Sequence, residues 1–309
     1  MQAPRDKPRR IKGQILVARA RDAWVPAWPQ KIRAVLALCG DRYVSAKRIS
    51  QVILEDYGLT FRLFRLMNSA FFSVHRKDLV SVRYMVVLLG LENLAKAVSK
   101  AHVIRPPQRI VPARDIGLFV IARGVFSSAI ASALAEELKI NQEKATVVSM
   151  FRNMGEVISA IVIPDIFVSA TKTPSGVIDE VRFKRACGGY DPEGLGLELA
   201  RYWNMPELLQ LAICPARFNL KMRGVNEQRL LLLADLAREL ILAGLLKGQG
   251  TRRLDLAKMA IMDECGIEDK ILDNILFDAV RNFPKRHGFF YRLLRSQGLF
   301  NHIFPGVAL

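Results

Sequence analysis

Histidine is scarce in this sequence, and its four copies are isolated from one another. The chain has 309 residues, with histidines only at positions 75, 102, 287 and 302, and it contains no H-x-x-x-H pair. A protein that holds a divalent metal for hydrolysis needs clustered imidazole and carboxylate ligands. The histidine pattern therefore argues against a histidine-based metal centre.

Cysteine is equally sparse. The four cysteines lie at positions 39, 187, 214 and 265, and none is within CxxC distance of another. This spacing indicates neither a zinc framework nor a disulfide framework, so we expect reduced, partly buried thiols. No G-x-x-x-x-G-K-[ST] motif is present, which excludes a phosphate-binding loop of that type.

Long apolar runs are also missing. The best candidate, 230–246, carries Asp235, Arg238 and Glu239 and is typical of a core helix rather than a membrane span. The N-terminus is basic but lacks the apolar stretch of a secretory signal. The sequence therefore predicts a cytoplasmic protein with no membrane span.

Charge of one sign is present in excess, and it is unevenly placed. Residues 1–110 hold 21 Lys/Arg and 7 Asp/Glu, a net +14, whereas the other 199 residues hold 25 and 22, a net +3. Such a field attracts acidic partners: nucleic acid, nucleotides, acidic proteins or anionic lipid. A merely solubilising surface is the alternative, and both interpretations stay open.

Apolar residues recur with helical periodicity throughout, and we find no convincing alternation with period two. At 59–72, for example, Leu63, Leu66, Met67 and Ala70 follow the i, i+3, i+4, i+7 rule. The fold class is therefore predicted to be all-α. Helices are expected near 30–39, 45–56 with Ser45 as N-cap, 59–72, 80–89, 92–102, from Asp191-Pro192-Glu193 to about 203, and 227–246, the longest.

The expected organisation has three parts. A basic leader covers 1–23, a helical domain covers 24–250 with a division between 110 and 111, and a helical extension covers 251–309. In the extension, aromatic and basic residues alternate over 281–309 without any acidic residue. Such a segment binds single-stranded nucleic acid or docks onto its own domain, and we rank docking first.

Several short segments, taken in order, resemble the HDOD family. The run LFRLMNSA at 63–70 is similar to the family's LLRLANSA type, and the likeness extends over roughly 24–246. Further similar elements are Trp28-Pro29-Gln30, Glu55-Asp56 with Leu59-Thr60, Arg76-Lys77, Ser81-Val82, Leu88 to Leu91, Tyr202 to Pro206, and Leu233-Ala234-Asp235. The resemblance implies a helical relative of the metal-dependent HD phosphohydrolases, in the setting of bacterial signal transduction.

The resemblance also shows where catalytic relatives would hold their metal. They use a His, a His-Asp pair, further histidines and a late Asp. In this sequence these ligands fall at Gly124, Arg152, Asn153, Pro192, a segment at 214–217, and Asp235. We call Gly124, Arg152, Asn153, Pro192 and Asp235 the relict positions. Since only Asp235 could bind a metal, the resemblance implies an HD-like second half with no metal site, no cofactor and no catalysis.

Two groups of polar residues remain as candidate binding sites. Arg62, Arg65 and Asn68 share the polar side of the 59–72 helix, which is a solvated face or a surface for an anion or partner. Arg152 is expected to pair with Glu156, one helical turn away, or with Asp235. The alternative is an anion clamp formed by Arg152 with Arg123.

The preferred function is therefore a non-catalytic signalling or regulatory scaffold that binds a protein partner of a signalling pathway. Binding of nucleic acid or a cyclic dinucleotide by the basic first third is the alternative. A hydrolase with a displaced site ranks third, because the ligands are missing.

Overall fold

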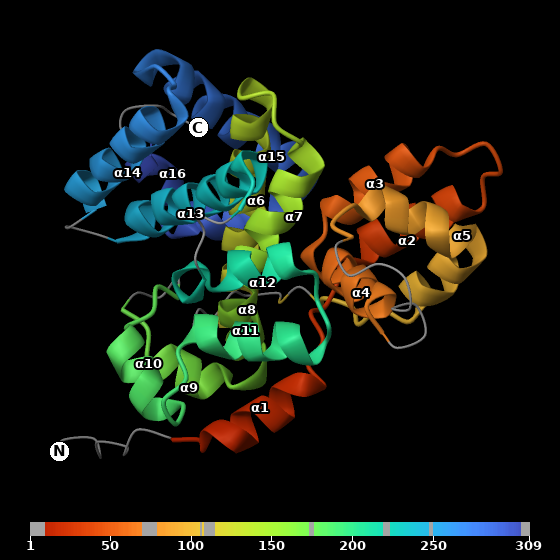
Figure 1. Ribbon diagram of the computed structural model, residues 1–309, viewed down its shortest axis with the longest axis horizontal. Coiled ribbons are helices and arrows are strands. Elements are labelled where there is room, and N and C mark those ends of the chain that lie inside the picture. Colours follow the sequence, from red (N-terminus) through yellow and green to blue (C-terminus); the bar gives the residue numbers. More distant parts are fainter. Residues whose placement is uncertain are drawn as a thin grey trace.

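The computed structural model describes residues 10–69, 79–105, 107, 115–172, 176–218, 223–246 and 250–303, and these segments are overwhelmingly helical (Figure 1). Within them no strand forms, and only isolated β-bridges occur, Ala27 with Val103 and Thr171 with Ile178. The all-α prediction is confirmed. Of the resembling segments, Arg76-Lys77 lies outside the described residues.

The N-terminal lobe consists of α2 (Pro29–Cys39), α3 (Ala46–Leu54), α4 (Tyr57–Met67) and α5 (Val82–Ser99). Ser45 caps α3 as predicted, since its hydroxyl accepts from the Arg48 backbone N–H. Asp56 caps α4 and also accepts from the Trp28 N–H, which fixes the segment that leads into α2. The prediction of two helices that meet at Gly90 is confirmed within α5, since Gly90 has a non-helical backbone, with a φ of 70°, and the helix is kinked there.

The main body is built around α6 (Ile116–Glu137), which packs against α7 (Gln142–Arg152), α13 (Val225–Leu245) and α15 (Asp269–Ser296). Between α7 and α13 the chain forms α8 (Met154–Val162), α9 (Pro164–Ser169), α10 (Glu180–Ala186), α11 (Pro192–Tyr202), α12 (Glu207–Ile213) and the 3-10 turn η2 (Pro215–Arg217). The predicted start of α11 is confirmed: Asp191 accepts from Gly194 N–H at 2.6 Å, and Pro192 is the first helical residue.

The most apolar long helix is α6, not 230–246 as the sequence indicated. An 18-residue window of α6 has a mean hydropathy of 1.8, enough in length and composition to cross a membrane, and α7 with α8 passes the same test as a pair bent by 43°. However, 78% of the α6 window is buried inside the protein. Its apolar surface therefore belongs to the core under α7, α13 and α15.

Part of the basic leader forms a helix that packs against the main body. Gly13–Arg21 forms α1, which buries Leu16, Val17 and Ala20 against α8 and α11. Residues 1–9 lie outside the described residues.

The C-terminal segment is docked onto the main body. It forms α14 (Gly250–Cys265), α15 and α16 (Leu299–Ile303), and α15 is kinked at His287. The longest unbroken helix among the described residues is α6 with 22 residues, one more than α13, so the prediction that the 227–246 helix is the longest was wrong. Phe126 of α6 contacts Phe283 and Phe300 edge to face, with ring centroids 4.8 and 5.3 Å apart. These contacts confirm the prediction that the aromatic residues dock onto their own domain. Burial of large aromatic side chains contributes most of the stabilisation in such contacts.

Candidate functional site

The relict positions lie where four helices of the main body meet. Gly124 lies in the middle of α6, Arg152 ends α7, Asn153 joins α7 to α8, Pro192 begins α11, and Asp235 lies in α13. The helices that carry them pack against one another, so residues far apart in sequence come together here.

Arg152 is the centre of one ion-pair cluster. Its Nε donates to Asp235 Oδ1 at 2.8 Å, and its Nη1 lies 2.7 Å from Glu193 Oε1. Nη1 also donates to the Ile213 carbonyl at 3.2 Å. Of the two pairings expected from sequence, the one with Asp235 forms and the one with Glu156 does not. Glu193 was not foreseen as a partner, because its position after Pro192 was explained by the start of the helix alone.

Glu156 is the centre of a second, deeper cluster. It is only 5% exposed, and its carboxylate accepts from Arg123 on one side and from Arg238 on the other, the latter at 2.5 Å. Burial opposes its charge, but Arg238 and Arg123 outweigh burial and hold the pKa of Glu156 below its ordinary value. Arg238 continues the cluster to Glu239 at 2.9 Å.

The two clusters leave no anion clamp between Arg123 and Arg152. Each guanidinium already faces a carboxylate of the protein itself. Arg238, which sequence reasoning missed, carries a recognisable signal: it follows Asp235 by three residues and so lies on the same side of α13.

A side chain from the N-terminal lobe fills the space beside Gly124. A Cβ added at Gly124 would lie 3.1 Å from the Tyr57 ring, and the Tyr57 hydroxyl donates to the Met150 carbonyl at 2.8 Å. The ring is buried, and burial raises the pKa of Tyr57. The missing side chain at the first relict position thus lets α4 insert an aromatic residue into the main body.

These residues do not fit a divalent metal. The relict positions supply one carboxylate, Asp235, and it is already paired with a guanidinium. Among the described residues, no group of three or more His, Cys, Asp and Glu side chains is arranged to hold a metal ion. The guanidinium of Arg152 lies beside Asp235, the remaining ligand position, in place of a metal ion.

The stripe of Arg62, Arg65 and Asn68 is not a solvated face, so that interpretation was wrong. Arg62 Nε donates to the Ala97 carbonyl at 2.6 Å, and Arg65 Nη1 to the Ala23 carbonyl at 2.5 Å. The Arg65 guanidinium also stacks over Trp24 at 4.1 Å and Trp203 at 4.5 Å. Asn68 is buried and donates to the Phe64 carbonyl. The chain around Trp24 crosses this face, and flat aromatic rings accept guanidinium groups well.

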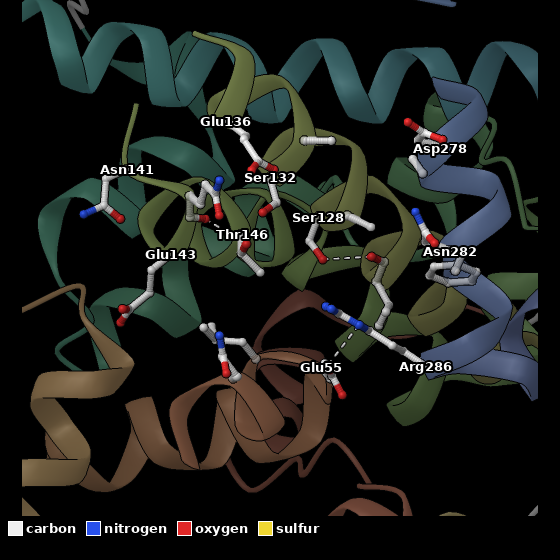
Figure 2. Close-up of a pocket in the computed structure, with 18 of the residues that line it drawn as sticks. Glu55, Ser128, Ser132, Glu136, Asn141, Glu143, Thr146, Asp278, Asn282 and Arg286 are labelled. Carbon is white, nitrogen blue, oxygen red and sulfur yellow. Dashed lines mark hydrogen bonds and ion pairs between the residues drawn. The ribbon is translucent and has the colours of Figure 1, made fainter. Parts of the chain in front are cut away.

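A cleft of about 1230 Å³ separates the N-terminal lobe from the main body (Figure 2). Its walls are α3, α6, α7 and α15, and Arg83 of α5 lines it as well; Ser128, Ser132 and Thr146 give it a polar surface. Polar contacts join the lobes beside the cleft. Arg286 Nε lies 3.4 Å from Glu55 Oε1, and the Ser81 hydroxyl donates to Glu143 Oε1 at 2.9 Å. Both signs of charge line the cleft, so it does not select an anion or a cation by its field alone.

Taken together, an all-α fold with arginine–carboxylate pairs at the relict ligand positions defines a degenerate HD-type domain. The sequence matches the HDOD domain family over residues 25–216, more than half of the chain. The protein belongs to the HDOD domain family. The matched residues end before α13, so the resemblance of Leu233 to Asp235 to the family's last helix lies beyond them.

Solved structures show the same fold at low identity. A virulence factor from Campylobacter jejuni subsp. jejuni aligns with a TM-score of 0.60 and 17% identity, covering 91% of this chain and 96% of that one. The MmoQ response regulator from Methylococcus capsulatus str. Bath aligns with a TM-score of 0.56 and 18% identity, covering 82% of this chain and 98% of that one.

A similar sequence occurs in an uncharacterized protein from Treponema pallidum (strain Nichols), which is 23% identical over 191 residues, 59% of this chain. That match spans only 36% of the Treponema protein's length.

Proposed function

We propose that this protein is a non-catalytic signalling module that works by binding a protein partner in the bacterial cytoplasm. The observation that carries the proposal is the guanidinium of Arg152 between Asp235 and Glu193 at the relict positions. Where HD phosphohydrolases activate water with a metal, this chain has a structural cation that holds α7, α11 and α13 together. Hydrolysis needs a polarised water, and no described residue at these positions supplies one.

The family and the fold support the signalling role. The chain belongs to the HDOD domain family, and its resemblance to that family implies a role in signal transduction. One protein of similar fold is a response regulator. The two lobes are in contact at α4, where Phe61 and Phe64 pack against Phe151 of α7. Beside α3, a polar cleft lies between them. Such a two-lobed helical body presents a large surface to a partner without a reaction centre.

The test has a catalytic part and a binding part. Purified protein is assayed against nucleotides, cyclic dinucleotides and generic phosphoesters with Mn²⁺, Mg²⁺, Fe²⁺ and Zn²⁺ added, and we expect background rates. Tagged protein is then recovered from its native cells, once without and once with nuclease, and binding to each recovered protein is repeated with purified components. Turnover that disappears in Asp235→Ala would contradict the proposal, as would recovery of nucleic acid alone.

A second candidate function rests on a separate observation. Over residues 24–105, the described part of the chain has eight exposed basic side chains and two exposed acidic ones, Asp41 and Glu92. Glu92 is moreover paired with Lys96 at 2.6 Å. An uncompensated basic surface of this kind supports binding of nucleic acid or an acidic nucleotide, and salt dependence tests it.

A further inference from the structure

The N-terminal lobe carries an exposed apolar stripe inside its basic surface. On the first part of α5, Val82, Met85, Val86 and Leu89 face the core. The opposite side exposes Tyr84, Val87 and Leu88, with Val87 61% exposed, and Arg83 lies beside them. We call Arg83, Tyr84, Val87 and Leu88 the α5 face. An apolar helix stripe that stays exposed among charges is typical of a docking surface.

The basic surroundings of the α5 face have few internal counterions. Eight exposed basic side chains belong to this lobe: Arg33, Arg42, Lys47, Arg48, Arg83, Lys96, Lys100 and Arg105. Within the described part of the chain, only Lys96 among them forms an ion pair. The α5 face is therefore complementary to a surface that is acidic as well as apolar.

A surface of that chemistry lies on α14 of the same chain. This helix exposes Leu256 and Met259, the latter 53% exposed, and Asp255 and Asp263 flank them, with the exposed Arg252 one turn before Leu256. From Met259 to Asp269 the sequence contains four acidic residues and no basic residue: Asp263, Glu264, Glu268 and Asp269. All four are exposed, and none forms an ion pair within the described residues. We call Asp255, Leu256, Met259 and the four acidic residues the α14 face.

The carboxyl end of α14 is an unfavourable position for the carboxylates of the α14 face. Asp263 and Glu264 occupy the last turn of α14, which has no basic residue. The carboxyl end of a helix carries partial negative charge, so carboxylates there raise the energy of the free helix. A cation brought against them from another molecule relieves this repulsion.

The α5 face begins beside α7, where Glu143 accepts from the Arg83 backbone N–H at 3.0 Å, whereas α14 lies on the side of the main body that faces away from the N-terminal lobe (Figure 1). One molecule therefore cannot bring its own α5 face against its own α14 face. Two copies can, because each carries one face of either kind. A contact between unlike faces is heterologous, and it closes into a ring or continues as a chain of molecules.

We propose that the α5 face of one molecule binds the α14 face of a second copy, so that the protein associates head to tail. Arg83 and its basic neighbours meet the carboxylates that end α14, while Tyr84, Val87 and Leu88 pack against Leu256 and Met259. Complementary charge gives the contact its orientation and its salt dependence, and the apolar centres exclude water.

The experiment uses two variants that each disable one face. Arg83→Glu with Val87→Asp disables the α5 face, and Met259→Lys with Asp263→Lys disables the α14 face. All four positions are exposed, and far-UV circular dichroism with urea unfolding verifies that the variants fold. Masses are measured by sedimentation equilibrium over a range of concentrations at about 50 mM and about 500 mM NaCl, because salt screens such contacts.

Wild type is expected to grow in mass with concentration at low salt and to approach the monomer at high salt. Each variant alone stays monomeric, but an equimolar mixture forms a 1:1 dimer and grows no further, because one intact face of each kind remains. A matched control, Val181→Asp with Arg182→Glu on exposed positions of α10, associates like wild type.

Three results would overturn the proposal. They are a wild type that stays monomeric at low salt, a mixture that stays monomeric, and loss of association in only one of the two variants. The last result would mean that the affected face binds something other than its counterpart, such as an acidic protein of another kind.

Discussion

Arg152 and Asp235 form an ion pair of 2.8 Å across α7 and α13, and the two residues differ sharply in exposure. The Arg152 side chain is 7% exposed, whereas that of Asp235 is 45% exposed. The guanidinium keeps Glu193 and the Ile213 carbonyl as further acceptors. The pair therefore anchors a buried cation with a carboxylate that water also solvates.

This asymmetry predicts that Asp235→Asn is well tolerated. The half-exposed partner is screened by water, and Glu193 still neutralises Arg152, so we expect a loss of at most about 1 kcal/mol in the free energy of unfolding. Urea unfolding at neutral pH measures it. A loss several times larger would mean that Asp235 carries the cluster and that Glu193 does not compensate.

Glu156→Gln is predicted to be far more damaging. The change leaves Arg123 and Arg238 buried without their shared carboxylate, and breaking a buried pair in this way costs about 3–5 kcal/mol. The matched control is Glu207→Gln, which breaks a surface pair with Arg223 and should cost less than about 1 kcal/mol. Equal losses for the two variants in urea unfolding would contradict the role assigned to Glu156.

The same cluster predicts an acid-sensitive term in stability. Because the folded pKa of Glu156 lies below its ordinary value of 4.5, its stabilisation is complete above about pH 4.5. It is lost as pH falls through the folded pKa. Buried Asp56 contributes in the opposite direction: burial raises its pKa to about 6, so its contribution to stability falls as pH rises from 3.8 to about 6.

The difference between wild type and Glu156→Gln isolates the first term, because Asp56 is present in both proteins. That difference in unfolding free energy should stay level from pH 7 to about 5 and shrink below about 4.5. Urea unfolding at a series of pH values measures it. A difference that stays constant down to pH 3 would show that Glu156 has the same pKa in the folded and unfolded protein, so that folding does not lower it.

Sequence alone predicted the helical class, the cap of α3, the start of α11 and the docking of the C-terminal aromatic residues. The cap of α3 and the start of α11 depend on local patterns, Ser45 before a helix and Pro192 after Asp191, which act within one turn. The docking of the C-terminal aromatic residues is a contact between distant segments, and it was predicted because such a segment commonly docks onto its own domain. The pairing of Arg152 with Asp235 was also among the two expected, because the resemblance placed both at one pocket.

The remaining features depend on contacts between segments distant in sequence. Nothing near Arg65 shows that Trp24 and Trp203 cover it, so a helix face with two arginines was interpreted as solvated. Likewise, Glu156 lies one turn from Arg152, but its carboxylate pairs with Arg123 and Arg238, which approach from other helices, and not with Arg152. Long cationic side chains bury their stems and find acceptors at a distance, which periodicity does not record.

The purified protein is expected to contain no stoichiometric Mn, Fe, Zn or Mg. The relict positions offer a single carboxylate ligand, and Arg152 holds a positive charge against it. Elemental analysis after dialysis against a chelator measures the content. A metal present at nearly one atom per chain after that treatment would mean that ligands elsewhere in the chain form a site.

The last prediction concerns polyanion binding by the N-terminal lobe. Each phosphate that a Lys or Arg neutralises releases condensed counterion, so the logarithm of the affinity falls linearly with the logarithm of the salt concentration. With roughly four to six contacts on duplex DNA the slope should be about −4 to −5, since each contact contributes near −0.9. Arg62 and Arg65 are poor positions for testing this, because their guanidinium groups hold the lobe's own carbonyls and reversing their charge would disturb the fold.

The exposed Arg42 and Arg48 are better positions, because nothing in the described structure depends on their side-chain charge. Reversal of both to Glu should weaken binding of a fluorescent DNA duplex and reduce the salt slope by about 2, since each phosphate contact contributes near −0.9. The matched control reverses Arg182 and Arg185, two exposed arginines of α10 in the main body, and should leave the slope unchanged. Binding that weakens equally in both variants would point to the net charge of the whole protein rather than to the lobe. No binding at low salt would remove nucleic acid as a partner, and the basic surface would then remain a surface for acidic proteins.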